Sequence, residues 1–286
     1  MKQKYQGIMY IISAAFFFAL MSFFVRLAGD LPTLQKGFFR NVVAMCVAGV
    51  ILARSEEGFR IKKGSMPLLI LRAVCGTIGL ICNFYAVDHM NISDANMLNK
   101  LAPFFAIIMS TFILKEKANR FEWGMVVLAF TGALFVAKPS FNIASFPALL
   151  AAIGGLGAGT AYTFVRKLGK QGERSPVIVM FFSTFSCIFT LPFVLLNYHP
   201  MTIVQFACLI LAGCSAAAGQ ICVTAAYTKA PAKEISVYDY SQVLFAAILG
   251  LVFLNQLPDM YSIIGYIIII CAAVLKWRHN LSQGST

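Results

Sequence analysis

The stretch Ala95–Phe105 reads ANMLNKLAPFF and places a lysine inside a long apolar run. Lys100 has Asn96 and Asn99 before it and Pro103 after it. A charged side chain at the centre of a membrane helix costs about 2.5–3.5 kcal/mol on insertion scales, so such residues face a partner or a cavity. The fold must therefore place Lys100 where one of these is present.

The whole chain is too apolar for a soluble domain. Of its 286 residues, 59% are hydrophobic and 12% are charged, whereas a soluble domain has roughly 45–50% apolar and about 25% charged residues. The eight cysteines all lie in apolar runs without a CxxC pair, and the three histidines lie near segment ends. Cysteines in such positions behave as small buried apolar residues. We therefore expect no metal site and no cofactor.

Ten stretches have the length of about 20 apolar residues that a membrane-spanning helix needs. They are residues 7–28, 34–53, 66–87, 92–114, 121–138, 147–168, 176–196, 202–227, 234–254 and 260–277. The first is too long for the apolar part of a signal peptide, and it shows no small-residue cleavage pattern. The predicted fold class is an all-α integral membrane protein with ten transmembrane helices.

The net charge of +12 follows from where the basic residues lie. With the N-terminus in the cytoplasm, most Lys and Arg residues fall in cytoplasmic segments, at residues 2–4, 54–63, 115–120, 166–174, 229–233 and 276–278. The opposite loops hold Lys138, with Lys36 at a helix start. This positive-inside bias predicts a multi-pass protein of the plasma (inner) membrane with both termini cytoplasmic. The cations set the topology, so no nucleic-acid partner is expected.

A shift of the chain by 140 residues aligns several short matches. Phe24-Val25-Arg26 falls on Phe164-Val165-Arg166, and Phe105-Ala106 falls on Phe245-Ala246. The constant offset predicts two repeats, residues 1–140 and 141–286. Each repeat would hold five spans, and an odd number inverts the second repeat relative to the first. Inverted repeats provide alternating access to a site near the midplane; a duplication with a purely structural role is the other interpretation.

The same shift matches the polar cluster around Lys100 with a second cluster. The members are Asn96, Asn99, Lys100 and Pro103 in the fourth span and Ser236, Asp239, Tyr240 and Val243 in the ninth. At about 100° per residue each set shares one helix face, and at 1.5 Å per residue each lies about 9–12 Å into its helix. We expect the clusters to converge near the midplane, where Lys100 and Asp239 either pair directly or each hold a substrate group. Lys100 could instead reach the outer surface along its own stem.

Other polar residues lie within or near the spans. Arg40 is about two turns into the second span and is a candidate cavity residue, whereas Arg26 is assigned to the interface. Arg72 begins the third span on the cytoplasmic side and is interpreted as a topology anchor. Asn83 and Gln220 lie at mid-span, where they could hydrogen-bond a ligand or join helices, which is the commoner use.

The run IGGLGAGTAY at residues 153–162 contains Gly155 and Gly159 with GxxxG spacing. It lacks the Lys-Ser/Thr that follows a phosphate-binding loop, and no strand precedes it. The spacing instead predicts close packing of this helix against a neighbour.

The chain resembles EamA-type carriers of the drug/metabolite transporter superfamily over nearly its whole length. The similarity lies in LAPFFAIIMSTFILKEK (residues 101–117), FFRN (38–41) and LRAVCG (71–76). The second half departs from the pattern, because Val243 stands at the expected proline and Asn-Gln (255–256) replaces the usual Gly-Glu. The resemblance implies a secondary carrier with a central cavity that moves small metabolites.

The sequence predicts a secondary transporter of a small polar metabolite, driven by a gradient or by exchange because no ATP-binding motif is present. Arg40 and Lys100 outnumber Asp239, which favours a carboxylate-bearing substrate such as an amino acid or an organic anion. The alternative is an exporter of cationic or amphipathic compounds or of nucleoside-like metabolites, with Asp239 holding the cation beside Tyr238 and Tyr240.

A channel and an intramembrane enzyme are more remote alternatives. An enzyme would need paired acids, a Ser-His arrangement or metal ligands within the spans, and the spans show none of these patterns. The expected partners are the small-molecule substrate and the lipid bilayer, and the sequence is compatible with a monomer.

Overall fold

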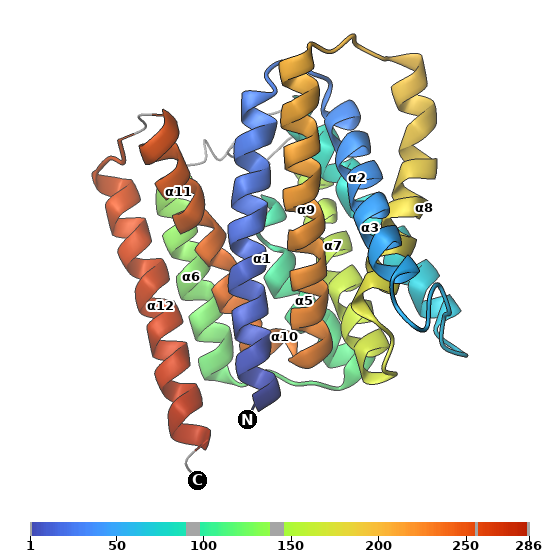
Figure 1. Ribbon diagram of the computed structural model, residues 1–286. Coiled ribbons are helices and arrows are strands. Elements are labelled where there is room, and N and C mark those ends of the chain that lie inside the picture. The colour runs from blue at the N-terminus through green and yellow to red at the C-terminus, as the bar shows by residue number, and fades with distance from the viewer. Residues whose placement is uncertain (1, 90–97, 138–145, 255–256, 285–286) are drawn as a thin grey trace.

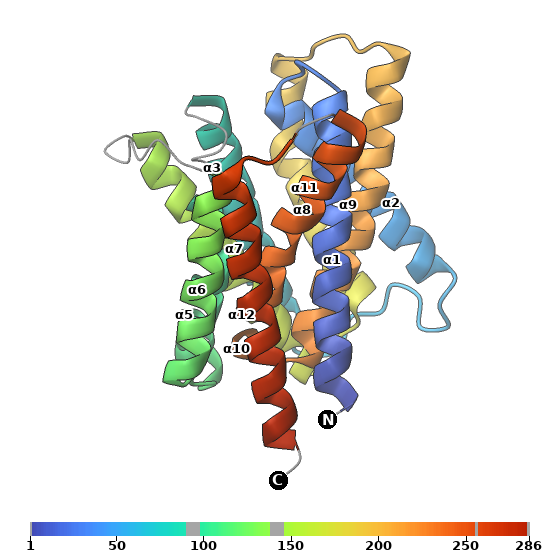
Figure 2. The ribbon, with the colours of Figure 1, turned by 90° about the vertical axis from the view of Figure 1, so that its left-hand side faces the viewer.

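The computed structural model describes residues 2–89, 98–137, 146–254 and 257–284, and these form a bundle of helices without strands (Figures 1 and 2). The helices of the first half are α1 (Lys2–Leu27), α2 (Thr33–Ala53), α3 (Met66–His89), α5 (Ala102–Leu114) and α6 (Arg120–Ala137). The second half contains α7 (Phe146–Lys170), α8 (Ser175–Leu196), α9 (Ile203–Lys229), α10 (Ala232–Ile235), η1 (Ser236–Tyr240), α11 (Ser241–Leu254) and α12 (Met260–Gly284).

The lengths and compositions of these helices fit a membrane-spanning fold. Among the residues described, eight helices are long and apolar enough to cross a membrane, and Ala102–Leu114 is a shorter apolar helix. A lipid environment explains why large apolar side chains such as Ile203 and Leu196 remain exposed on the bundle. The predicted class, an all-α integral membrane protein, is confirmed.

Two of the predicted spans are not continuous α-helices. In the predicted span 92–114, Leu98 and Asn99 are helical, Lys100 and Leu101 form a turn, and α5 begins at Ala102. Pro103 occupies one of the first positions of α5, where its missing N–H is tolerated. The first part of this span, including Asn96, lies outside the described residues.

The predicted span 234–254 breaks at the matching place. The short helix α10 is followed by η1, a 3-10 helix over Ser236–Tyr240, before α11 continues. A 3-10 helix has 3.0 residues per turn, so Ser236, Asp239 and Tyr240 do not follow the spacing of an α-helix. The prediction that each cluster lies within a continuous α-helix is therefore wrong, because a helix break occurs in both.

Helix packing follows the predicted correspondence between the two halves. The 140-residue shift matches α1 to α7 and α3 to α9. α1 packs extensively on α9, and α7 packs extensively on α3. In the same way α5 packs on α7 and α11 packs on α1. The pairs α2–α8 and α6–α12 join helices that the shift matches to each other. Two structurally equivalent halves would produce this set of contacts.

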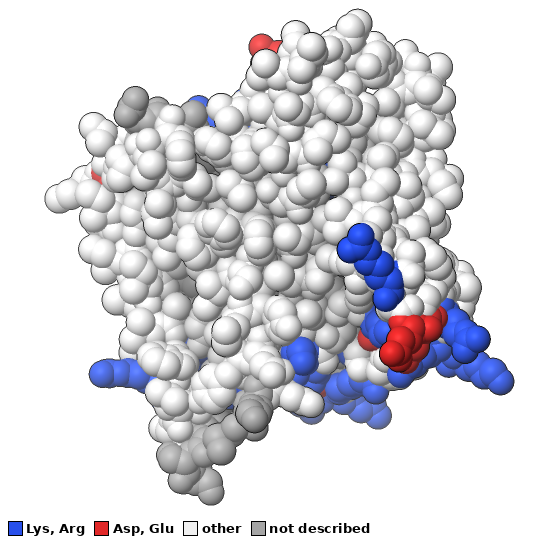
Figure 3. Space-filling model, in the orientation of Figure 1, with Lys and Arg blue, Asp and Glu red and all other residues white. Residues whose placement is uncertain are grey.

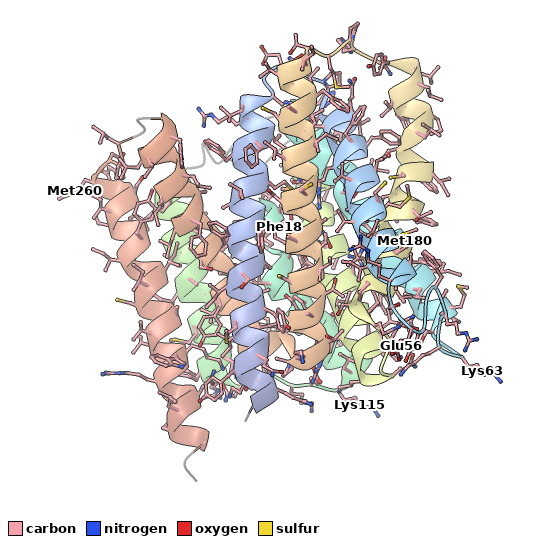
Figure 4. All side chains as sticks on the ribbon, in the orientation of Figure 1. Phe18, Glu56, Lys63, Lys115, Met180 and Met260 are labelled. Atoms are coloured by element: carbon pink, nitrogen blue, oxygen red, sulfur yellow. The ribbon has the colours of Figure 1, made fainter. Side chains whose placement is uncertain are left out.

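Small residues allow several of these helices to approach closely. A Cβ atom added at Gly159 of α7 would lie 2.6 Å from the carbonyl oxygen of Ala102, and one at Gly155 would lie 3.0 Å from that of Leu98. The prediction that the GxxxG spacing produces close helix packing is confirmed. The ring of Phe18 in α1 packs against Gly219 of α9. Phe18 is labelled in Figure 4.

Basic residues gather at one end of the bundle, the end where α1 begins and α12 ends (Figures 1 and 3). Lys4 Nζ lies 3.0 Å from Glu234 Oε2. Lys276 Nζ lies 3.4 Å from Glu122 Oε1 and 3.4 Å from Glu234 Oε2, and Lys276 is only 1% exposed. These pairs join α1, α6, α10 and α12. We call this end, defined by Lys4, Glu122, Glu234 and Lys276, the basic end.

Glu116 joins the two halves at the same end. Its Oε1 lies 2.7 Å from Lys170 Nζ and 3.3 Å from Arg166 Nε. Arg166 also donates from Nη1 to the carbonyl oxygen of Thr228 at 2.9 Å. Glu116 therefore joins the segment after α5 to the end of α7, and Arg166 joins the end of α7 to the end of α9.

Replacing Gly159 by alanine should destabilise the protein. The added Cβ would meet backbone atoms of α5, and overpacking of this kind costs about 1–3 kcal/mol. The matched control is Gly124→Ala in α6, where nothing lies within 4 Å of the added Cβ. Thermal unfolding in detergent should show a lower Tm for Gly159→Ala and an unchanged or higher Tm for the control. Equal values would show that the fold does not depend on this close approach.

Candidate functional site

The two helix breaks meet at an ion pair. Lys100 Nζ lies 3.2 Å from Asp239 Oδ2 and donates to Gln242 Oε1 at 2.6 Å. The Tyr240 hydroxyl donates to the carbonyl oxygen of Lys100 at 2.9 Å, and these two residues are 140 positions apart. Residues that the repeat matches to each other are therefore in direct contact. The structure brings the two clusters together and directs Lys100 to Asp239.

This ion pair lies inside the bundle without being sealed from solvent. The side chain of Lys100 is 20% exposed and that of Asp239 is 19% exposed. Each charge compensates the other, because an ion left alone at a buried position carries a large desolvation cost. Gln242 adds a third polar group to the pair. The arrangement leaves a charged, partly accessible contact between the two halves of the chain.

A second polar group surrounds Arg72 in the second turn of α3. The interpretation of Arg72 as a topology anchor is wrong, because the residue is only 2% exposed. Its guanidinium carbon lies 3.8 Å from the centroid of the Phe182 ring of α8, and Nη2 donates to Gln220 Oε1 of α9 at 3.4 Å. Three helices therefore enclose this charge.

Stacked tyrosines of α7 and α9 lie near the two polar groups. Tyr162 and Tyr227 stack with ring centroids 4.7 Å apart and an interplanar angle of 9°. Tyr162 lies within electrostatic range of Arg72, Arg40 and Asp239. The ion pair and the arginines thus belong to one polar region of the bundle interior.

The remaining predicted site residues differ in their surroundings. Arg40 in α2 is partly buried, and its Nε has no hydrogen-bond partner among the described residues. The Oδ1 atom of Asn83 likewise has none, and Asn83 lies where α3 packs on Gly154 of α7. Asn99 is partly buried beside α7, and Ser236 is fully buried in η1. Asn96 lies outside the described residues.

Gln242 and Arg72 belong to this region although neither is a predicted site residue. The 140-residue shift places Gln242 opposite Ala102, so the repeat provides no polar counterpart for it. In the sequence, the feature that indicates a role for Gln242 is its position three residues after Asp239. Among the described residues, no group of three or more His, Cys, Asp or Glu side chains is placed to hold a metal ion.

A hollow elsewhere in the structure has a different character. It lies between α2, the segment after it, and α8, and has a volume of about 370 Å³. Its lining is almost wholly apolar and includes Leu52, Phe59 and Met180. None of the charged residues described above lines it, so it is not part of the polar region.

Broken helices that meet at charged groups inside a membrane bundle form the binding sites of many membrane transporters. The chain belongs to the EamA-like transporter family, which matches residues 5–138 and 145–277. A crystal structure covering 94% of this chain and 96% of its own chain has the same fold, with a TM-score of 0.83 at 13% sequence identity.

Several characterised proteins are similar over most of the chain. The pseudopaline exporter CntI of Pseudomonas aeruginosa is 27% identical and covers 95% of this chain and 96% of its own. Human solute carrier family 35 member G1 is 26% identical, with 96% and 80% covered. The S-adenosylmethionine uptake transporter of Rickettsia bellii is 23% identical, with 74% and 73% covered. The chain is therefore a membrane transporter and not an enzyme.

Lys100 and Asp239 should behave as one energetic unit. Asp239→Asn leaves the lysine charge unpaired, and Lys100→Met leaves the carboxylate unpaired, so each single variant should unfold more easily. The double variant should lose less unfolding free energy than the two single losses added together. The difference should be about 0.5–3 kcal/mol, as is usual for residues in contact. Thermal unfolding in detergent measures this cycle.

The control cycle combines Asp239→Asn with Lys63→Met. Lys63 is exposed and points away from the helices at the basic end (Figure 4). These two changes should add without coupling. Additive effects for Lys100 and Asp239 as well would show that their contact has no energetic weight.

Proposed function

We propose that the chain is a secondary transporter of a small polar metabolite that carries a carboxylate or another anionic group, such as an amino acid or an organic anion. The observation that carries this proposal is the charge of the polar region. Lys100 already has Asp239 as its partner. Arg40 and Arg72 have no carboxylate within ion-pair distance among the described residues, so this region has an excess of positive charge that an anionic group would neutralise.

The substrate contacts proposed for this region come from both halves of the chain. The first half contributes Lys100, Asn99, Arg40 and Asn83, with Asn96 as a further candidate, and the second contributes Asp239, Tyr240, Ser236 and Gln220. Residues 1–140 and 141–286 would move as two inverted repeats, which expose the site to each side in turn. The excess of Lys and Arg at the basic end favours a cytoplasmic position for that end and for both termini.

The named substrates of the relatives support transport of polar metabolites. One relative exports pseudopaline and another takes up S-adenosylmethionine. S-adenosylmethionine contains an amino-acid carboxylate, which is the group proposed here. Because one relative is an exporter and the other an importer, flux should be measured in both directions.

The proposal is tested with purified protein reconstituted in liposomes. A thermal-shift screen of amino acids, organic acids, amines and nucleosides first ranks compounds, since a ligand of the folded state raises Tm by mass action. Labelled uptake into preloaded vesicles should then be saturable and stimulated by the same compound inside. We expect uptake of an acid and no uptake of its uncharged amide. Ohmic current would instead indicate a channel, and Asp239-dependent uptake of an amine would favour the cationic alternative.

Uptake should depend on the charged residues of the polar region. Lys100→Ala and Arg40→Ala should each lower uptake at least about tenfold, because hydrogen bonds to charged groups are worth about 1.5–3 kcal/mol. Lys63→Ala removes an exposed cation at the basic end and should leave uptake unchanged. If Lys100→Ala and Asp239→Ala both transport at the wild-type rate, this assignment of the site is wrong.

A further inference from the structure

We infer that Arg72 is an anion-binding residue of the transport site, held in a fixed orientation by Gly76, Phe182 and Gln220 to receive a carboxylate of the substrate. This inference rests on the proposed function and adds to it the group that contacts the substrate anion.

The surroundings of Arg72 fix the plane of its guanidinium group. A Cβ atom added at Gly76, one turn further along α3, would collide with Nη1 of Arg72 and lie 2.9 Å from Cε2 of Phe182. The Phe182 ring covers one face of the guanidinium, with its centroid 3.8 Å from the guanidinium carbon. Gln220 accepts a hydrogen bond from Nη2 at 3.4 Å. The absence of a side chain at Gly76 therefore provides the space that this arrangement needs.

The hydrogen-bonding capacity of Arg72 is largely unused. A guanidinium has five N–H donors, and the bond to Gln220 is the one that the described residues provide. The Nε atom is buried without a hydrogen-bond partner. A buried cation without a carboxylate is costly, and the contact with Phe182 offsets part of that cost. An incoming anion would satisfy both the charge and the free donors.

The geometry favours a carboxylate as the group that binds. The N–H donors of a guanidinium lie in its plane, so a ligand binds along its edge, where a planar carboxylate can accept two parallel hydrogen bonds. Phe182 covers one face and leaves that edge as the binding direction. Arg40 lies within electrostatic range of Arg72 and adds a second positive charge. Because Arg72 is 2% exposed, the carboxylate reaches it when the helices around it separate, as alternating access requires.

A purely structural role is the competing explanation. Arg72 links α3 to α8 and α9, and it could serve as a clamp between these helices. A clamp predicts that variants lose stability without any change in their response to anions. The two roles are therefore separated by ligand dependence.

The experiment compares benzoate with its uncharged isostere benzamide as probes of the purified full-length protein. Benzoate should raise the Tm of the wild-type protein and benzamide should not. Arg72→Gln and Gly76→Ala should each weaken the apparent benzoate affinity about 10- to 100-fold, since a charge-assisted hydrogen bond is lost. Arg72→Lys keeps the charge without the planar fork and should fall between the wild type and Arg72→Gln. Gly124→Ala in α6 is the glycine control and should keep the wild-type response.

The inference is overturned if benzoate and benzamide act alike on the wild type, or if the variants keep the wild-type benzoate dependence. If Arg72→Gln does not fold, Gly76→Ala decides, because it keeps the arginine and changes its orientation. Carboxylate uptake that needs Arg40 and Lys100 but survives both Arg72→Gln and Gly76→Ala would refute this site and leave the proposed function intact. Benzoate stabilisation that Arg72→Gln abolishes, in a protein that takes up no carboxylate, would support the anion site and refute the proposed function.

Discussion

Backbone groups freed by a helix break must find partners within the protein, because lipid offers none. The first break meets that constraint through the second, and the second meets it in part through its own side chains. The Tyr240 hydroxyl donates to the carbonyl oxygen of Lys100, and the Ser241 hydroxyl donates to that of Tyr238 within the same break. The Tyr240 contact between the breaks satisfies the Lys100 carbonyl oxygen, and the Lys100 ammonium pairs with the Asp239 carboxylate across the same breaks. The Lys100–Asp239 ion pair depends on this contact between the two breaks.

The contact between the two breaks requires that each break pack closely against a neighbouring helix. For the first break, α7 provides Gly155 and Gly159, which would clash with it if they carried side chains. For the second break, α1 contacts η1 and α11. In both cases the first helix of one half supports the broken helix of the other. This reciprocal packing of the first helices on the broken helices joins the two halves of the chain.

Much of this arrangement follows from the sequence, because the bilayer fixes the length of a spanning helix and the distribution of Lys and Arg fixes the orientation of the helices. The repeat offset was enough to predict that the Lys100 and Asp239 clusters converge. It could not predict the 3-10 helix over residues 236–240, since that depends on local hydrogen bonds and tertiary packing. Arg72 looks the same in sequence whether it faces head groups or α8 and α9. Gln242 has no polar counterpart in the other half, so the repeat gave no signal for it.

The placement of the charges also relates the ion pair to transport. Lys100 belongs to one half of the chain and Asp239 to the other, so a movement of the halves under the proposed alternating access would separate them. Separating two ions in a partly desolvated interior is costly unless another charged or polar group takes the place of each partner. Arg40 and Arg72 would attract an anionic compound to the same polar region. A substrate that supplied such a group would lower the barrier to the movement, which would link the conformational change to the presence of cargo.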